Sequence, residues 1–135
     1  MSCRLLDHSF NLVSILEEFL RSRGDGGAVS TFMGFVRPNG FQSKVESLWI
    51  EHYPQMTEDH LRVLEEEART QWSLDQTLLV HRIGIIAVSE PIVLVATSSQ
   101  HRQDARLACD YLVEQLKLNA LFWKKEQGGN VDYWV

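Results

Sequence analysis

The sequence predicts an α+β fold with a mainly antiparallel sheet. Two patterns indicate it. Segments rich in β-branched and aromatic residues come in pairs separated by amphipathic helices, in the order helix, strand, strand, helix, strand, strand, helix, strand. Gly, Pro or Ser residues mark most of the breaks between them. The length of 135 residues suits a single domain over 1–135, in which we expect the helices to pack on one side of the sheet.

The first expected elements are a helix over residues 11–23 and strands over 28–37 and 45–53. Asn11 is the expected N-cap of the helix, and Gly24 is placed to end it in a left-handed conformation. Apolar side chains recur in this helix at helical spacing: Leu12, Ile15, Leu16, Phe19 and Leu20.

A second helix is expected over residues 58–71, after a strand that ends at Pro54. Thr57 is its expected N-cap. Its buried stripe comprises Leu61, Leu64, Ala68 and Trp72. The opposite face is acidic and is predicted to be solvated: Glu58, Asp59, Glu65, Glu66 and Glu67.

Two further strands, 77–88 and 92–99, precede a third helix that Ser98 or Ser99 would cap. The apolar stripe of this helix comprises Ala105, Ala108, Cys109, Leu112 and Leu116. After Asn119 the sequence "ALFWKKE" predicts a last strand.

Composition and motifs argue against several classes of protein. A net charge of −5 disfavours a general nucleic-acid or membrane-surface binder. No apolar run approaches the roughly 20 residues of a membrane span, and no signal peptide is recognisable. Two cysteines without metal or disulfide spacing favour the cytoplasm. Metal-binding, Walker, GxGxxG and GxSxG motifs are absent, so no metal site is expected.

Cationic residues nevertheless gather at places where ligands bind. Arg37 ends a strand, and His101 and Arg102 stand in the first turn of the third helix. A helix N-terminus with basic side chains suits a phosphate, although an exposed turn is an equally good explanation.

Lysines form a second cationic group near the C-terminus. Lys117 lies at the end of the third helix, where compensation of the helix dipole alone would explain it. Lys124 and Lys125 are neighbours in the last strand, so only one of them can face a given pocket. The residues alone therefore predict a pocket for a small anion.

Five motifs occur in register: "EHYPQM" (51–56), "HRIG" (81–84), "SSQHR" (98–102), "LK" (116–117) and "FWKKE" (122–126), within a similarity that runs from about residue 26 to 125. In these motifs the chain resembles the catalytic (large) subunit of molybdopterin synthase. The resemblance implies an α/β hammerhead-type domain with an added antiparallel β subdomain.

The same resemblance implies a sulfurtransferase of molybdenum cofactor biosynthesis. Such an enzyme converts cyclic pyranopterin monophosphate (precursor Z) to molybdopterin. The dithiolene sulfurs arrive as a thiocarboxylate on the C-terminal Gly-Gly of a small ubiquitin-like subunit, so no cofactor is expected. A homodimer of large subunits would form the core of a heterotetramer.

The resemblance also assigns residues to roles. The lysines that match catalytic positions are Lys117 and Lys124. Those matching the anion-binding group around the pterin and its phosphate are Arg37, His101 and Arg102. Lys125 and Glu126 extend the pocket wall.

One departure from the family pattern keeps a second hypothesis open. Phe35 stands where relatives often have Lys, which removes one possible anion contact. A degenerate paralogue of this kind would be a non-catalytic receptor for a ubiquitin-like tail. A third hypothesis, single-stranded nucleic-acid binding through Trp123 and the lysines, has the net charge against it.

Overall fold

The computed structural model describes residues 3–39, 44–118, 122–128 and 131–134. Along the chain the elements are β1 (Cys3–Leu6), α1 (Leu12–Ser22), β2 (Ala28–Phe35), β3 (Ser47–His52), α2 (Pro54–Gln71), β4 (Gln76–Arg82), β5 (Gly84–Ala87), β6 (Pro91–Ser99), α3 (Arg102–Leu118), β7 (Phe122–Gly128) and β8 (Val131–Trp134).

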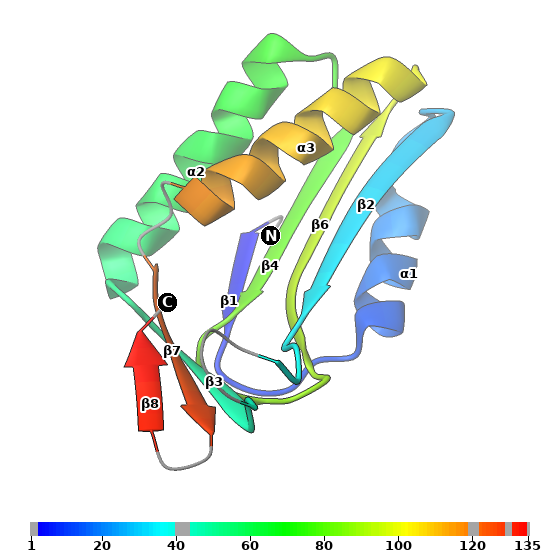
Figure 1. Cartoon of the computed structure of the whole chain (residues 1–135). Coiled ribbons are helices and arrows are strands. Elements are labelled where there is room, and N and C mark those ends of the chain that lie inside the picture. The colour runs from blue at the N-terminus through cyan, green and yellow to red at the C-terminus, as the bar shows by residue number, and fades with distance from the viewer. Residues whose placement is uncertain (1–2, 40–43, 119–121, 129–130, 135) are drawn as a thin grey trace.

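The strands form two four-stranded sheets (Figure 1). The first has the order β1-β4-β6-β2 and the second the order β5-β3-β7-β8. Every neighbouring pair is antiparallel except β1 and β4. The predicted α+β class, with an added antiparallel subdomain, is therefore confirmed.

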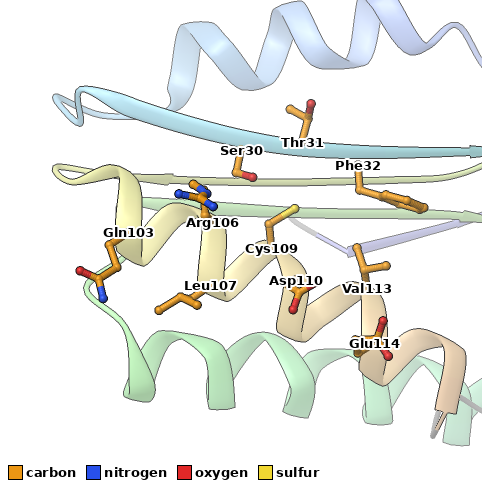
Figure 2. Close-up of a pocket in the computed structure, with 10 residues that line it drawn as sticks. All are labelled: Ser30, Thr31, Phe32, Gln103, Arg106, Leu107, Cys109, Asp110, Val113 and Glu114. Carbon is orange, nitrogen blue, oxygen red and sulfur yellow. The ribbon is translucent and has the colours of Figure 1, made fainter.

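The helices cover both faces of the first sheet, so the expectation that they pack on one side is wrong. On one face Phe19 of α1 packs on even-numbered residues of β4 and β6: Leu78, Val80, Leu94 and Ala96. On the other face α2 and α3 cover Leu79 and Val95 with Leu61, Leu64, Ala68, Cys109 and Leu112. The central strands β4 and β6 are buried on both sides, and their alternate side chains point to opposite faces. Figure 2 shows the sheet between α1 and the other two helices.

Both predicted ends of α1 are confirmed. The Asn11 Oδ1 accepts a hydrogen bond from the Ser14 backbone N–H at 3.1 Å. Gly24 has a φ of 87°, a conformation that few residues other than glycine adopt.

The second helix begins at Pro54, earlier than predicted. A proline at the first helical position loses no hydrogen bond, because the N–H there has no intrahelical partner. Thr57 is consequently inside the helix and buried, and its Oγ accepts a bond from the Tyr53 backbone N–H at 3.0 Å. Thr57 thus satisfies the backbone N–H of Tyr53, the residue before the helix, although Thr57 itself lies in the first helical turn.

Glu65 also differs from the prediction, because it is buried and not solvated. The Thr77 hydroxyl donates to the Glu65 Oε2 at 2.5 Å, and Arg69 donates to the Thr77 Oγ at 2.9 Å. Helical periodicity placed Glu65 on the solvated face. The Thr77 hydroxyl, on β4, gives its carboxylate a hydrogen-bond partner, and this makes burial possible.

The predicted strand 77–88 is two strands that belong to different sheets. Gly84, with a φ of 83°, turns the chain so that β4 pairs with β6 whereas β5 pairs with β3. The strand β1, which was not predicted, pairs in parallel with β4 and covers that edge of the sheet.

Ser98 and Ser99 belong to β6, so the predicted caps of the third helix are wrong. Their hydroxyls donate to the carbonyls of Arg23 at 2.9 Å and Ser73 at 2.6 Å, which ties β6 to the connections that follow α1 and α2. The helix α3 begins at Arg102.

The last predicted strand is confirmed as β7, although Asn119, Ala120 and Leu121 lie outside the described residues. Phe122 packs both against the core under α2 and α3 and against the core of the second sheet. It therefore joins the two sheets. In the part of the chain that the structure describes, no helix is long and apolar enough to cross a membrane.

Candidate functional site

A hollow of about 340 Å³ lies where the end of β2, the end of α3 and the start of β7 come together over β4 and β6. Its lining is apolar except for four residues. The apolar lining comprises Phe32, Gly34, Phe35, Ile92, Val93, Val95, Val113 and Leu116, and the other four residues are Arg37, His81, Lys117 and Lys124.

Three predicted site residues meet in this hollow, each on a different element. Arg37 follows β2, Lys117 is in the last turn of α3, and Lys124 is in β7. Two backbone hydrogen bonds fix the chain beside Arg37: the Val36 N–H donates to the Glu90 carbonyl at 3.0 Å, and the Ser89 N–H to the Val36 carbonyl at 2.9 Å. Residues up to 87 positions apart in the chain therefore share one site.

The turn that holds the chain beside Arg37 is itself fixed by a partly buried ion pair. The Arg82 guanidinium, 4% exposed, lies 3.5 Å from the Glu90 Oε2 and donates to the Ile85 carbonyl at 2.9 Å. The Glu90 carboxylate also accepts bonds from the Ser9 hydroxyl at 2.5 Å and the Ala87 N–H at 3.1 Å. These bonds, that from Ser9 first, hold the pKa of Glu90 below its ordinary value.

Lys124 holds its proton less tightly than an ordinary lysine does. Burial in the wall of the hollow lowers its pKa, and the positive charge of Lys117 lowers it further. A lysine in this position releases its proton more readily than an ordinary lysine, and while charged it can stabilise negative charge that develops beside it.

His101 and Arg102 are not part of this hollow in the single chain. Both are exposed at the start of α3, whereas Lys117 is at its other end. A helix of 17 residues is about 25 Å long, so the predicted anion-binding group is split into two parts.

Lys125 and Glu126 do not line the hollow either. Lys125 points to the other face of β7, where its Nζ lies 5.9 Å from the centroid of the Trp49 ring. Glu126 pairs with Leu48 further along the second sheet. The expectation that only one of the two adjacent lysines can face the pocket is confirmed, and that lysine is Lys124.

His81 lines the hollow and was not among the predicted site residues. Its ring is buried and stacks on Phe122, with centroids 4.0 Å apart and planes 10° apart. Burial lowers its pKa to about 4, with smaller contributions from the charges of Lys124 and His52. Strand alternation was the available signal, because it places His81 on the same face as Leu79, under α2 and α3.

A second, larger hollow of about 580 Å³ lies between β2 and the outer side of α3. Figure 2 shows its lining: Ser30, Thr31, Phe32, Gln103, Arg106, Leu107, Cys109, Asp110, Val113 and Glu114. Phe32 and Val113 line both hollows, so the two adjoin. Burial raises the pKa of the Cys109 thiol, which makes it a poor nucleophile.

Acidification is expected to destabilise the protein through His81. In the unfolded chain this histidine binds a proton near pH 6.5, whereas in the folded chain it does so only near pH 4. The stabilisation from the neutral ring is therefore complete above the unfolded pKa and is lost as the pH falls from about 6.5 to about 4. It amounts to at most about 3 kcal/mol. Urea unfolding at about pH 7 and about pH 4.5 should show a steeper loss for the wild type than for His81→Phe. Equal losses would contradict the buried, neutral imidazole.

Comparison with known proteins identifies the family. The family model described as MoaE protein matches residues 5–119. The chain is 38% identical over 135 residues to the molybdopterin synthase catalytic subunit of Caulobacter vibrioides, covering 100% of this chain and 89% of that protein. It is 40% identical over 124 residues to the Escherichia coli subunit of the same name, covering 90% and 83%.

Solved structures show the same fold. The crystal structure of molybdopterin synthase from Staphylococcus aureus matches with a TM-score of 0.88 at 32% identity, over 100% of this chain and 97% of that one. The molybdopterin biosynthesis MoaE protein of Burkholderia ambifaria matches with a TM-score of 0.83 at 34% identity, over 100% and 89%. The resemblance carried by the five motifs thus extends to the whole fold, and the chain belongs to the MoaE family.

Proposed function

We propose that the hollow with Arg37, Lys117 and Lys124 is the site at which this chain acts as the catalytic subunit of molybdopterin synthase. The activity is that of a sulfurtransferase in molybdenum cofactor biosynthesis. The observation that carries the proposal is the convergence of these three cations, from three separate elements, on one largely apolar hollow.

The site has the electrostatic character that the reaction needs. The substrate, a phosphorylated pterin, carries an anion that Arg37 and Lys117 can bind. An apolar wall excludes water and strengthens each charge interaction within it. A carboxyl-terminal thiocarboxylate, also an anion, is attracted to the same cations.

Each sulfur is then transferred in two steps. The thiocarboxylate sulfur attacks a side-chain carbon of the substrate and displaces an oxygen substituent: the carbon–sulfur bond forms as the carbon–oxygen bond breaks, and the departing oxygen takes up a proton. The partner's tail is then joined to the pterin as a thioester. Water adds to the thioester carbonyl and the carbon–sulfur bond to the tail breaks, which leaves sulfur on the pterin and a carboxylate on the tail. Lys117 and Lys124 stabilise the oxyanion of the second step, and Lys124 moves the proton.

The protein needs a partner and no resident cofactor for this chemistry. The partner is a small ubiquitin-like subunit whose C-terminal Gly-Gly carries the sulfur. The cysteines of this chain take no part, because Cys3 and Cys109 are both buried and burial raises both thiol pKa values. Two free cysteines also favour the cytoplasm as the compartment.

A second copy of the chain supplies His101 and Arg102 in this proposal. The strand β2 lies at an edge of its sheet, yet it exposes four large apolar side chains: Val29, Phe32, Met33 and Phe35. An apolar edge strand is a template for pairing with another chain. A homodimer formed through β2 would cover these side chains and the adjoining hollow of Figure 2.

Antiparallel pairing of β2 with its copy would complete the anion site. Ala28, at the start of β2, pairs with Ser99, which is two residues before His101. The other end of β2 leads to Arg37. A two-fold axis through the middle of β2 sets the start of one copy against the end of the other. Strand and helix are both about 25 Å long, so His101 and Arg102 of each copy would reach the hollow of its neighbour.

Conversion of precursor Z by the chain, reconstituted with its thiocarboxylated partner, tests the proposed function. Lys124→Arg keeps the charge, but a guanidinium does not give up its proton, so we expect kcat to fall by about 10² or more. Lys117→Ala should fall at least as far, because it removes an oxyanion donor.

Lys125→Ala is the matched comparison, since it alters the neighbouring lysine on the opposite face of β7. Its activity should stay within about threefold of wild type. A Lys117→Ala or Lys124→Arg enzyme with near-normal turnover would refute the assigned roles. A wild-type chain that binds the partner's tail but forms no dithiolene product would instead be a receptor.

Complementation between two inactive variants tests the two-copy site. One chain carries Lys117→Ala and the other carries His101→Ala with Arg102→Ala. If the residues act across the dimer, each mixed dimer has one intact site, and random coexpression restores about a quarter of the sites. If all of them act within one chain, every site in the mixture remains defective and activity stays at the level of the separate variants.

A further inference from the structure

His81 gives the hollow a property that the cations do not supply. Arg37 and the protonated Lys117 and Lys124 can only donate hydrogen bonds. Among the described residues that line the hollow, His81 has the one side chain able to accept a bond while the lysines are charged.

The tautomer of His81 follows from its backbone contact. Its Nδ1 lies 2.7 Å from the carbonyl oxygen of Arg82. A carbonyl only accepts, so Nδ1 carries the hydrogen and the Nε2 of the neutral ring keeps its lone pair. The lowered pKa agrees with a ring that stays neutral during catalysis.

The Nε2 atom belongs to a ring that lines the hollow. Within the described part of the chain it has no hydrogen-bond partner. The unpaired side-chain nitrogens that are sealed from solvent, among those same residues, belong to His60 and Arg82. An unpaired acceptor on a ring that lines the hollow and is fixed by Phe122 is in place for a ligand.

We propose that His81 is a substrate-binding residue whose Nε2 accepts a hydrogen bond from a ring N–H or amino group of the pterin. This inference rests on the proposed function of the hollow. The cations bind the phosphate and the tail, whereas His81 recognises the heterocycle and orients it. A nitrogen-rich bicyclic substrate needs such an acceptor, because its N–H groups find no partner among ammonium and guanidinium groups.

Two substitutions separate this role from simple packing. His81→Phe keeps a flat ring that can stack on Phe122 but has no acceptor. His81→Gln loses the ring but places an amide oxygen at a similar reach. If His81 serves only to pack, Phe is the tolerated substitution and Gln the damaging one; if it accepts a hydrogen bond, the order is reversed.

The measurement is steady-state turnover of precursor Z by the reconstituted complex, with urea unfolding of each variant as a check on folding. We expect the KM of His81→Phe to rise about tenfold with little change in kcat, and that of His81→Gln to stay within about threefold of wild type. Inhibition by inorganic phosphate should be unchanged in both variants, because the cations that bind it are intact.

Any other order overturns the inference, including equal loss in both variants. A fall in kcat at constant KM would mean that His81 acts on Lys124 and does not bind the substrate. Weaker phosphate inhibition in His81→Phe would show a collapsed hollow. If the wild-type complex forms no product, the proposed function fails and this inference fails with it; if the wild type is active and only the order differs, the inference alone is wrong.

Discussion

The contact between Phe122 and His81 is the constraint on which the site depends. These rings, 4.0 Å apart, lie where the second sheet meets the first, and Phe122 belongs to both cores. The pairing of His52 with Phe122 fixes the register of β7 on β3, and Lys124 follows two residues later on the same face. A register shift of one residue would point Lys125 at the hollow and Lys124 at the face of Trp49.

Burial at the junction of the two sheets changes the proton affinity of the charged groups there. A lysine at the surface would keep its proton and be screened by water. At the junction, desolvation and the nearby Lys117 weaken the hold of Lys124 on its proton, while the Arg82–Glu90 pair fixes the turn that carries Arg37. Stability and function therefore share the same residues, because the groups that join the sheets also shape the pocket.

The sequence predicted the three helices, most of the strands and the three cations of the hollow, but it did not predict β1 or how the strands divide between two sheets. Periodicity identified the helices. The family motifs contain Lys117 and Lys124, and Arg37 was identified from the family resemblance and its place at the end of a strand. Neither signal shows which face of a sheet a helix covers, or that a glycine at position 84 sends one continuous apolar run into two sheets. His101 and Arg102 match the motif, yet the fold of one chain holds them at the far end of α3, which a linear sequence does not reveal. His81 was overlooked because a buried histidine in a strand is ordinary until the neighbouring lysines are placed beside it.

A structure of the complex with the partner's C-terminal tail bound would test the central claim most directly. The claim is that one hollow, between α3 and β7, brings the tail and the pterin together. The terminal carbonyl carbon should lie in that hollow, with its oxygens about 3 Å from the Nζ atoms of Lys117 and Lys124. A tail that ends in the hollow between β2 and α3, or on the Trp49 face of β7, would contradict it.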